Sequence, residues 1–156
     1  MSSYLTFYLV PKKTKTRYWH DENGSHEEEI EISKGHPLSI MSFSRNNEVY
    51  QAYNETLNPV YAGIEDKYTE LTVADAERVV SEYEQEVKST EKRLEITYKM
   101  LKNGGSCESL WGDIHETERY LDEQKHALSE LKHLAGFVYE VTNSCTDIEK
   151  VLINID

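Results

Sequence analysis

The clearest pattern in the chain is a stripe of uncharged side chains that recurs at alternating steps of three and four residues in its second half. This spacing places side chains along one side of a helix and is typical of a helix that packs along another helix. The first stripe contains Val73, Ala76, Val80, Tyr83, Val87, Thr90, Leu94, Thr97 and Leu101. The second contains Cys107, Leu110, Ile114, Thr117, Leu121, Gln124, Leu128, Leu131, Ala135, Val138 and Thr142. The two stripes predict two long helices.

A short glycine-containing segment separates the stripes and indicates where the chain reverses. Asn103-Gly104-Gly105-Ser106 can end one helix, turn the chain and cap the next helix. When the chain is folded about this turn, paired residue numbers sum to about 208, so that Leu94 meets Ile114 and Val80 meets Leu128. The pattern therefore predicts a long antiparallel two-helix coiled-coil hairpin over residues 72–145, with helices of roughly 45–55 Å.

The N-terminal part of the chain carries patterns that favour β-structure. Residues 4–10 (YLTFYLV) alternate in a way that can bury both faces, which predicts a central strand. Residues 14–20 and 27–32 flank Asp21-Glu22-Asn23-Gly24-Ser25, and Asn-Gly between two β-prone runs predicts a β-hairpin. Opposite charges on its two arms can pair across the strands: Lys12, Lys13, Lys15 and Arg17 with Glu27, Glu28, Glu29 and Glu31.

Three further segments complete the predicted set of elements. Gly35-His36-Pro37 breaks the chain, and Ser44 is a candidate N-cap for a helix over residues 45–57. Residues 58–71 are predicted as a loop with a short strand at 68–71. Thr146 and Glu149 have capping-box spacing, which predicts a short helix at the C-terminal end, although VLINI could instead pair with a sheet edge.

Together these elements predict an α+β fold within one continuous domain, as a length of 156 residues favours. Residues 1–71 are expected to form a small β-rich base with one short helix. Residues 72–145 form the antiparallel helical hairpin that projects from this base. Residues 146–156 are expected to form a short C-terminal helix that packs on the base.

Composition and charge narrow the functional classes. The formal net charge of -12 opposes binding to a phosphate backbone, so we expect no direct nucleic acid binding. No stretch approaches the roughly 18 apolar residues of a membrane span, and the first residues do not resemble a signal peptide. Cys107 and Cys145 are too far apart along one helix to bond to each other, and free thiols fit a reducing compartment. We therefore expect a cytoplasmic protein without membrane contact.

No catalytic motif is found in the sequence. It contains no nucleophile elbow, P-loop, dinucleotide-binding glycine pattern, HExxH or paired CxxC. We therefore predict that the protein is not an enzyme and uses no cofactor or metal. Two alternatives remain open: a metal site at His20 and His26 beside Asp21 and Glu22, and single-stranded nucleic acid binding by the basic and aromatic stretch 12–19.

Apolar side chains outside the stripes indicate what the helical hairpin contacts. Leu134, Phe137 and Val141 lie at the open end of the hairpin, where the N-terminal half of the chain can cover them. Exposed aromatic and methionine side chains near the turn instead indicate a contact with a protein partner or with a second copy, which would give a homodimer through the hairpin. The predicted protein-binding residues are Tyr98, Met100, Trp111 and Tyr120.

Acidic side chains crowd the outer faces of both predicted helices, including like-charge pairs one turn apart. They are either solvated surface or an acidic face formed by Glu82, Glu86, Glu118 and Asp122. The leading hypothesis is a non-enzymatic interaction or structural accessory protein that presents a helical hairpin, and its small, acidic, tyrosine-rich composition suggests a bacteriophage or mobile element. The alternative is an acidic inhibitor that mimics nucleic acid and blocks a nucleic-acid-handling host-defence enzyme.

Overall fold

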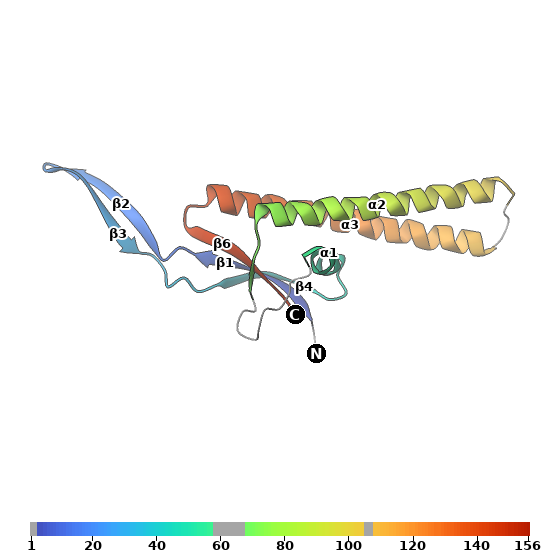
Figure 1. Ribbon diagram of the computed structural model, residues 1–156, viewed down its shortest axis with the longest axis horizontal. Coiled ribbons are helices and arrows are strands. Elements are labelled where there is room, and N and C mark those ends of the chain that lie inside the picture. Colours follow the sequence, from blue (N-terminus) through green and yellow to red (C-terminus); the bar gives the residue numbers. More distant parts are fainter. Residues whose placement is uncertain (1–2, 58–67, 105–107) are drawn as a thin grey trace.

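The computed structural model describes residues 3–57, 68–104 and 108–156, and it is an α+β fold, as predicted. Two long helices pack together beside a four-stranded sheet, and a two-stranded ribbon projects from that sheet (Figure 1). The elements in chain order are β1 (Tyr4–Pro11), β2 (Thr14–Asp21), β3 (Gly24–Glu31), β4 (Leu38–Ser44), α1 (Glu48–Leu57), β5 (Thr69–Glu70), α2 (Val73–Lys102), α3 (Glu108–Ser144) and β6 (Ile148–Ile155).

The sheet is antiparallel, with the strand order β4-β1-β6-β5. β1 lies between two other strands, which confirms the prediction of a central strand. Leu5 is opposite Phe43 on one side and Ile155 on the other, and Phe7 is opposite Met41 and Ile153. Leu5 and Phe7 are fully buried because alternate residues of β1 point toward the helices.

The C-terminal segment is a strand, so the predicted short helix over residues 146–156 is wrong. β6 lies inside the sheet between β1 and β5, and Val151, Ile153 and Ile155 are buried there. Capping-box spacing is a local preference worth about 1 kcal/mol. In the sheet, the β-branched run VLINI pairs with strands on both sides and is covered by helices. These interactions stabilise the strand by more than the capping preference stabilises a helix. The alternative of strand pairing was therefore the correct one, although the segment is internal and not at an edge.

The segment before the first helix also differs from the prediction. Residues 38–44 form β4, an edge strand that the sequence pattern did not predict because serines interrupt its apolar residues. Ser44 ends this strand and does not cap a helix. α1 begins at Glu48, and the Asn47 side chain accepts a hydrogen bond from the backbone N–H of Val49 at 2.8 Å. β5 falls within the predicted short strand at 68–71.

α2 and α3 lie side by side and antiparallel, and they extend well beyond the sheet (Figure 1). Thr72 caps α2, because its hydroxyl accepts a hydrogen bond from the backbone N–H of Asp75 at 3.1 Å. α2 ends at Lys102, and Gly104 has a φ of 93°, which suits glycine after a helix end. The predicted cap at Ser106 and the stripe position Cys107 lie outside the described residues.

Polar contacts between α2 and α3 agree with the predicted pairing. In three of these contacts, each residue follows a stripe residue of its own helix by four positions. Because the numbers of paired stripe residues sum to about 208, the numbers of these contact pairs should sum to about 216. They are Glu84 with Lys132 (3.3 Å), Glu91 with Lys125 (3.8 Å) and Tyr98 with Glu118. On the opposite side, Arg93 lies 2.9 Å from Asp113, and each residue directly precedes a stripe residue. Contacts on both sides of the seam therefore give the same register.

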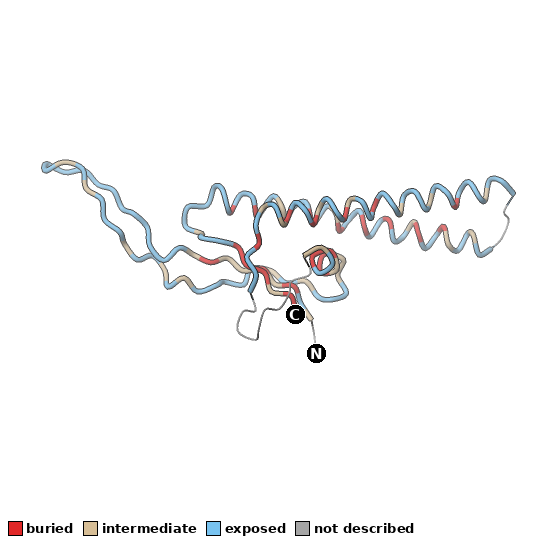
Figure 2. The backbone as a smooth tube through the Cα atoms, in the orientation of Figure 1, coloured by how far each residue is buried: buried red, intermediate tan, exposed pale blue. Residues whose placement is uncertain are grey.

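The helical hairpin has two sides that differ in what covers them. One side, here called the α1 side, carries Val79, Glu86, Arg93, Met100, Asp113, Tyr120, Ala127, Leu134 and Val141. α1 and the sheet bury its apolar members near the base, including Leu134 and Val141, as expected (Figure 2). Phe137 is partly buried against the same core. The other side, the open side, carries Glu84, Glu91, Tyr98, Trp111, Glu118, Lys125 and Lys132.

Candidate protein-binding surface

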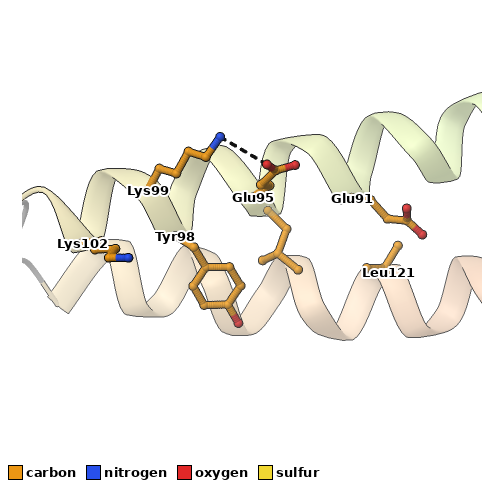
Figure 3. Close-up of a pocket in the computed structure, with 7 residues that line it drawn as sticks. Glu91, Glu95, Tyr98, Lys99, Lys102 and Leu121 are labelled. Carbon is orange, nitrogen blue, oxygen red and sulfur yellow. Dashed lines mark ion pairs between the residues drawn. The ribbon is translucent and has the colours of Figure 1, made fainter.

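An apolar groove opens on the open side, in the far half of the helical hairpin (residues 91–104 and 108–121). Its floor lies between the two helices, where Leu94 of the first stripe and Leu121 of the second both line it. Figure 3 shows Leu121 at this floor, with Tyr98 further toward the turn. Its volume is about 370 Å³. The lining residues are Glu91, Leu94, Glu95, Tyr98, Lys99, Lys102 and Leu121.

Tyr98 forms one wall of this groove. Its side chain reaches from α2 toward α3 (Figure 3). Its hydroxyl donates a hydrogen bond to Glu118. This hydrogen bond raises the pKa of Tyr98 above its ordinary value. On the rim, Lys99 pairs with Glu95 at 3.2 Å. The groove therefore has an apolar floor, an aromatic wall that is held in place, and a charged rim.

Trp111 lies on the same side, near the end of the hairpin. Half of its surface is exposed (50%), and its ring stacks on His115 with centroids 6.1 Å apart. Tyr98 is also exposed, at 43%. Tyr98 lines the groove, whereas Trp111 lies outside the lining on the same side of the hairpin. Exposed aromatic side chains of this kind are typical anchors for a protein partner.

The structure separates the four predicted protein-binding residues into two pairs. Tyr98 and Trp111 share the open side, whereas Met100 and Tyr120 lie on the α1 side. Burial, and then the nearby charges of Glu48 and Glu86, raise the pKa of Tyr120. Tyr120 thus borders the contact between α1 and the hairpin and is not part of the groove. Sequence periodicity defines these two sides but does not say which of them α1 covers.

The predicted acidic residues also fail to form one surface. Glu118 lies on the open side and accepts the hydrogen bond from Tyr98. Glu86 lies on the α1 side, Glu82 pairs with Arg78 at 3.6 Å, and Asp122 is exposed on α3. Nothing in the described contacts brings these four carboxylates together.

A different acidic cluster forms where α1 meets α2. Burial, and then the charge of Glu55 and a hydrogen bond with it, raise the pKa of Glu86, and the charges of Glu48 and Glu82 act in the same direction. The Tyr83 hydroxyl donates a hydrogen bond to Glu48 at 3.2 Å. The sequence pattern does not predict Glu48 and Glu55 as part of an acidic surface, because their place beside Glu86 depends on how α1 docks. The sequence did contain one indication of this cluster: Glu48 and Glu55 are seven residues apart, which places both on the same side of α1.

The β2–β3 ribbon carries its own exposed chemistry. Trp19 stacks on His26 with ring centroids 5.2 Å apart, and the Arg17 guanidinium lies 5.6 Å from the Trp19 ring centroid. His26 is 2.8 Å from Asp21. Within residues 3–57, 68–104 and 108–156, no group of three or more His, Cys, Asp or Glu side chains could hold a metal ion.

The predicted charge pairing across this ribbon is mostly not realised. Arg17 is directly opposite Glu28, but Lys15 is opposite Ile30. Lys15 instead lies 3.6 Å from Asp147, next to β6. The register of the β2–β3 ladder decides which residues are opposite each other. A shift of one residue would move every side chain of one strand to the other face and would change all of these pairs.

Comparison of the chain with protein-family models, with curated proteins and with solved structures gives no match. In the described part of the chain, none of the helices is both long enough and apolar enough to span a membrane. Cys145 is an exposed free thiol, and Cys107 lies outside the described residues.

Proposed function

We propose that this protein is a non-enzymatic interaction protein that binds a protein partner through the open side of its helical hairpin. One observation carries the proposal: the apolar groove at Leu94, Tyr98 and Leu121 lies in the far half of the hairpin, beyond α1 and the sheet (Figure 1). An apolar centre with aromatic anchors and a charged rim is the usual anatomy of a protein interface.

The shape and lining of the groove favour an apolar side chain or a short helix of a partner as its occupant. Leu94 and Leu121 supply the floor, and Trp111 supplies a large surface that a partner can desolvate. The lining offers apolar packing and separated rim charges, which favours binding over catalysis. A second copy could use the same groove, which would give a homodimer through the hairpin. The acidic, tyrosine-rich composition supports a cytoplasmic accessory role in a bacteriophage or mobile element.

Affinity purification from the native host, followed by mass spectrometry, tests this proposal with two variants. The double variant Tyr98→Ala and Trp111→Ala should reduce recovery of the partner at least tenfold, because truncating aromatic anchors typically costs 2 kcal/mol or more of binding energy. Tyr139→Ala is the matched control, since Tyr139 is an equally exposed aromatic residue of α3 outside the groove. Equal recovery with the double variant, or equal loss with the control, would contradict the proposal.

A second candidate function is an acidic inhibitor of a nucleic-acid-handling enzyme. The observation in its favour is the cluster of Glu48, Glu55, Glu82 and Glu86, whose mutual repulsion a basic partner would relieve. Its binding should weaken steeply with added salt and should be lost on charge reversal at Glu48, Glu55, Glu82 and Glu86. An interaction that is insensitive to salt but lost in Trp111→Ala would favour the groove instead.

A further inference from the structure

β4 is an edge strand that lacks the usual protection against pairing. Natural edge strands are commonly very short or carry charges or proline, because their free backbone groups can pair with another chain. The opposite edge of the sheet, β5, is only two residues long, and both strands of the β2–β3 ribbon are rich in charged residues. β4 has seven residues, LSIMSFS, without charge, proline or glycine. Among the described strands, it pairs only with β1.

The ladder identifies which backbone groups of β4 point outward. The backbone N–H of Arg45 donates to the carbonyl of Ser3 at 2.9 Å, just beyond the pair of Tyr4 and Ser44. In an antiparallel ladder, hydrogen-bonded and non-bonded pairs alternate. Phe43 and Met41 therefore direct their backbone groups toward β1, and Ser42 between them directs its N–H and carbonyl toward the free edge.

We infer that two copies of this chain associate through β4, in an antiparallel pair around a two-fold axis at Ser42. In this register Ser42 exchanges two backbone hydrogen bonds with Ser42 of the partner subunit. Met41 is then opposite Phe43 of the partner subunit, and the two four-stranded sheets become one continuous sheet. A two-fold contact satisfies the same groups in both copies, which is the commonest arrangement of protein dimers.

Side-chain burial on the helix-facing side of the sheet supports this register. Met41 and Phe43 pack against the core but are only partly buried, and the Phe43 ring meets Phe7 edge to face at 6.0 Å. Pairing at Ser42 brings one apolar side chain against another across the new strand pair, which removes more of both from water. No charged side chain within Leu38–Ser44 enters the contact.

Charge restricts where two copies of this chain can meet. A chain with a formal net charge of -12 repels its own copies over most of its surface. The uncharged strand β4 is a place where two copies can approach without opposing like charges. The register shift of β4 against Phe7 and Tyr8 limits the regular pairing to the last part of the strand. The contact is therefore short, and the dimer should depend on protein concentration.

Sedimentation equilibrium over a range of protein concentrations tests the inference. Ser42→Pro removes an outward N–H without removing a β1–β4 hydrogen bond, so it should weaken dimerisation at least tenfold in a folded chain. Ser42→Lys, which places two like charges at the axis, should have the same effect if the proline variant does not fold. Ser42→Ala keeps the N–H and should leave the dimer unchanged. The inference is overturned by a wild-type chain that stays monomeric into the hundreds of micromolar, or by a dimer that survives both variants.

A cross-linking experiment tests the register itself. In a chain with Cys107→Ser and Cys145→Ser, the added change Ser42→Cys should give a covalent dimer with a short thiol-to-thiol cross-linker. Residues opposite each other in a hydrogen-bonded antiparallel pair have Cα atoms about 5.5 Å apart, which is within reach of such a reagent although their Cβ atoms are too far apart for an unstrained disulfide. Ser44→Cys is the control, because Ser44 lies two residues from the axis in each copy and should not cross-link. Failure of Ser42→Cys to cross-link at concentrations that give a dimer would overturn the pairing.

The partner-binding groove and the β4 dimer can be tested independently of each other. A dimer that persists in Ser42→Pro but is lost in Trp111→Ala would place the contact between copies in the helical groove and not at β4. A dimer that is lost in Ser42→Pro leaves the groove free for a partner in each copy. The dimerisation measurements therefore do not depend on whether the partner of the groove is found.

Discussion

The β2–β3 ribbon and the α2–α3 hairpin are both antiparallel arms that project from the sheet, but they are built on different principles (Figure 1). β2 is exposed along its whole length, and no residue of β3 is buried. The helical hairpin buries a seam even in its far half, beyond α1, where Thr97, Ile114 and Thr117 are buried. Figure 2 shows buried positions along both helices. One side of each helix faces its neighbour, whereas side chains of a ribbon alternate between two faces that both lack a covering layer. Two helices can therefore form a core by themselves, and two strands cannot.

This comparison predicts its largest effect in the helical seam. Leu131→Ala should lower the free energy of unfolding by about 2–4 kcal/mol, because Leu131 is fully buried and the lost side chain leaves a cavity. Leu121→Ala should cost a similar amount, and Leu128→Ala should cost less because Leu128 is only partly buried. Urea unfolding followed by circular dichroism measures the series. An unchanged stability in Leu131→Ala or Leu121→Ala would show that the seam does not hold the helices together.

A substitution of Gln124, in the same seam, should raise the free energy of unfolding instead of lowering it. Its side chain is 2% exposed, and within the described residues its Oε1 atom has no hydrogen-bond partner. Gln124→Leu should therefore raise the free energy of unfolding by about 1 kcal/mol, since it removes a buried acceptor without a partner. Thermal unfolding of this variant beside Gln124→Ala, which loses packing, separates the two effects. A lower stability of Gln124→Leu would indicate that the amide donor of Gln124 matters more than its acceptor.

A smaller effect is expected at Glu86, where the helical hairpin meets α1. Because the fold raises the pKa of Glu86, its charged form is disfavoured in the native state. Glu86→Gln should therefore stabilise the protein at neutral pH by roughly 0.2–0.5 kcal/mol, the scale of a like-charge pair on a helix surface. The gain should disappear as the pH falls from the raised pKa toward the unfolded value, because the native state then takes up the proton. Melting curves of both proteins at several pH values test this; a gain that does not change with pH contradicts it.

The smallest effect is expected in the β ribbon. Trp19→Ala should change global stability by less than about 0.5 kcal/mol, because the stack of Trp19 on His26 is exposed and separate from the core. Hydrogen exchange should nevertheless show faster exchange in β2 and β3 than in α3, as expected for a unit without buried contacts. A loss of stability as large as that of Leu131→Ala would mean that the ribbon packs against something.

The two errors in the fold prediction share one physical cause. β4 and β6 are strands because β1 lies beside them, at a sequence distance of tens to more than a hundred residues. A local pattern reports only what a segment does with its immediate neighbours. At Thr146 to Glu149 that local preference indicated a helix, and pairing with Leu5, Phe7 and Leu9 outweighed it.

The sequence likewise predicted only part of the candidate site. Periodicity alone places Tyr98 and Trp111 on one side of the helical hairpin and Met100 and Tyr120 on the other. The docking of α1 then decides which side is covered, and it also brings Glu48 and Glu55 to Glu86. The groove at Leu94 and Leu121 depends on how side chains pack in the seam. A stripe of uncharged residues in the sequence does not specify this packing.

The sequence by itself determined the two long helices, their antiparallel pairing and register, the ribbon with its Asn-Gly turn, and the central place of the first strand. These features rest on contacts between segments close in sequence or on a pattern repeated over many turns, so each carries its own signal. The tertiary structure alone decided that the C-terminal segment enters the sheet, that a serine-rich strand forms its edge, and which side of the helical hairpin stays open. Those outcomes depend on which distant segment provides the partner surface, and no single segment of the chain contains that information.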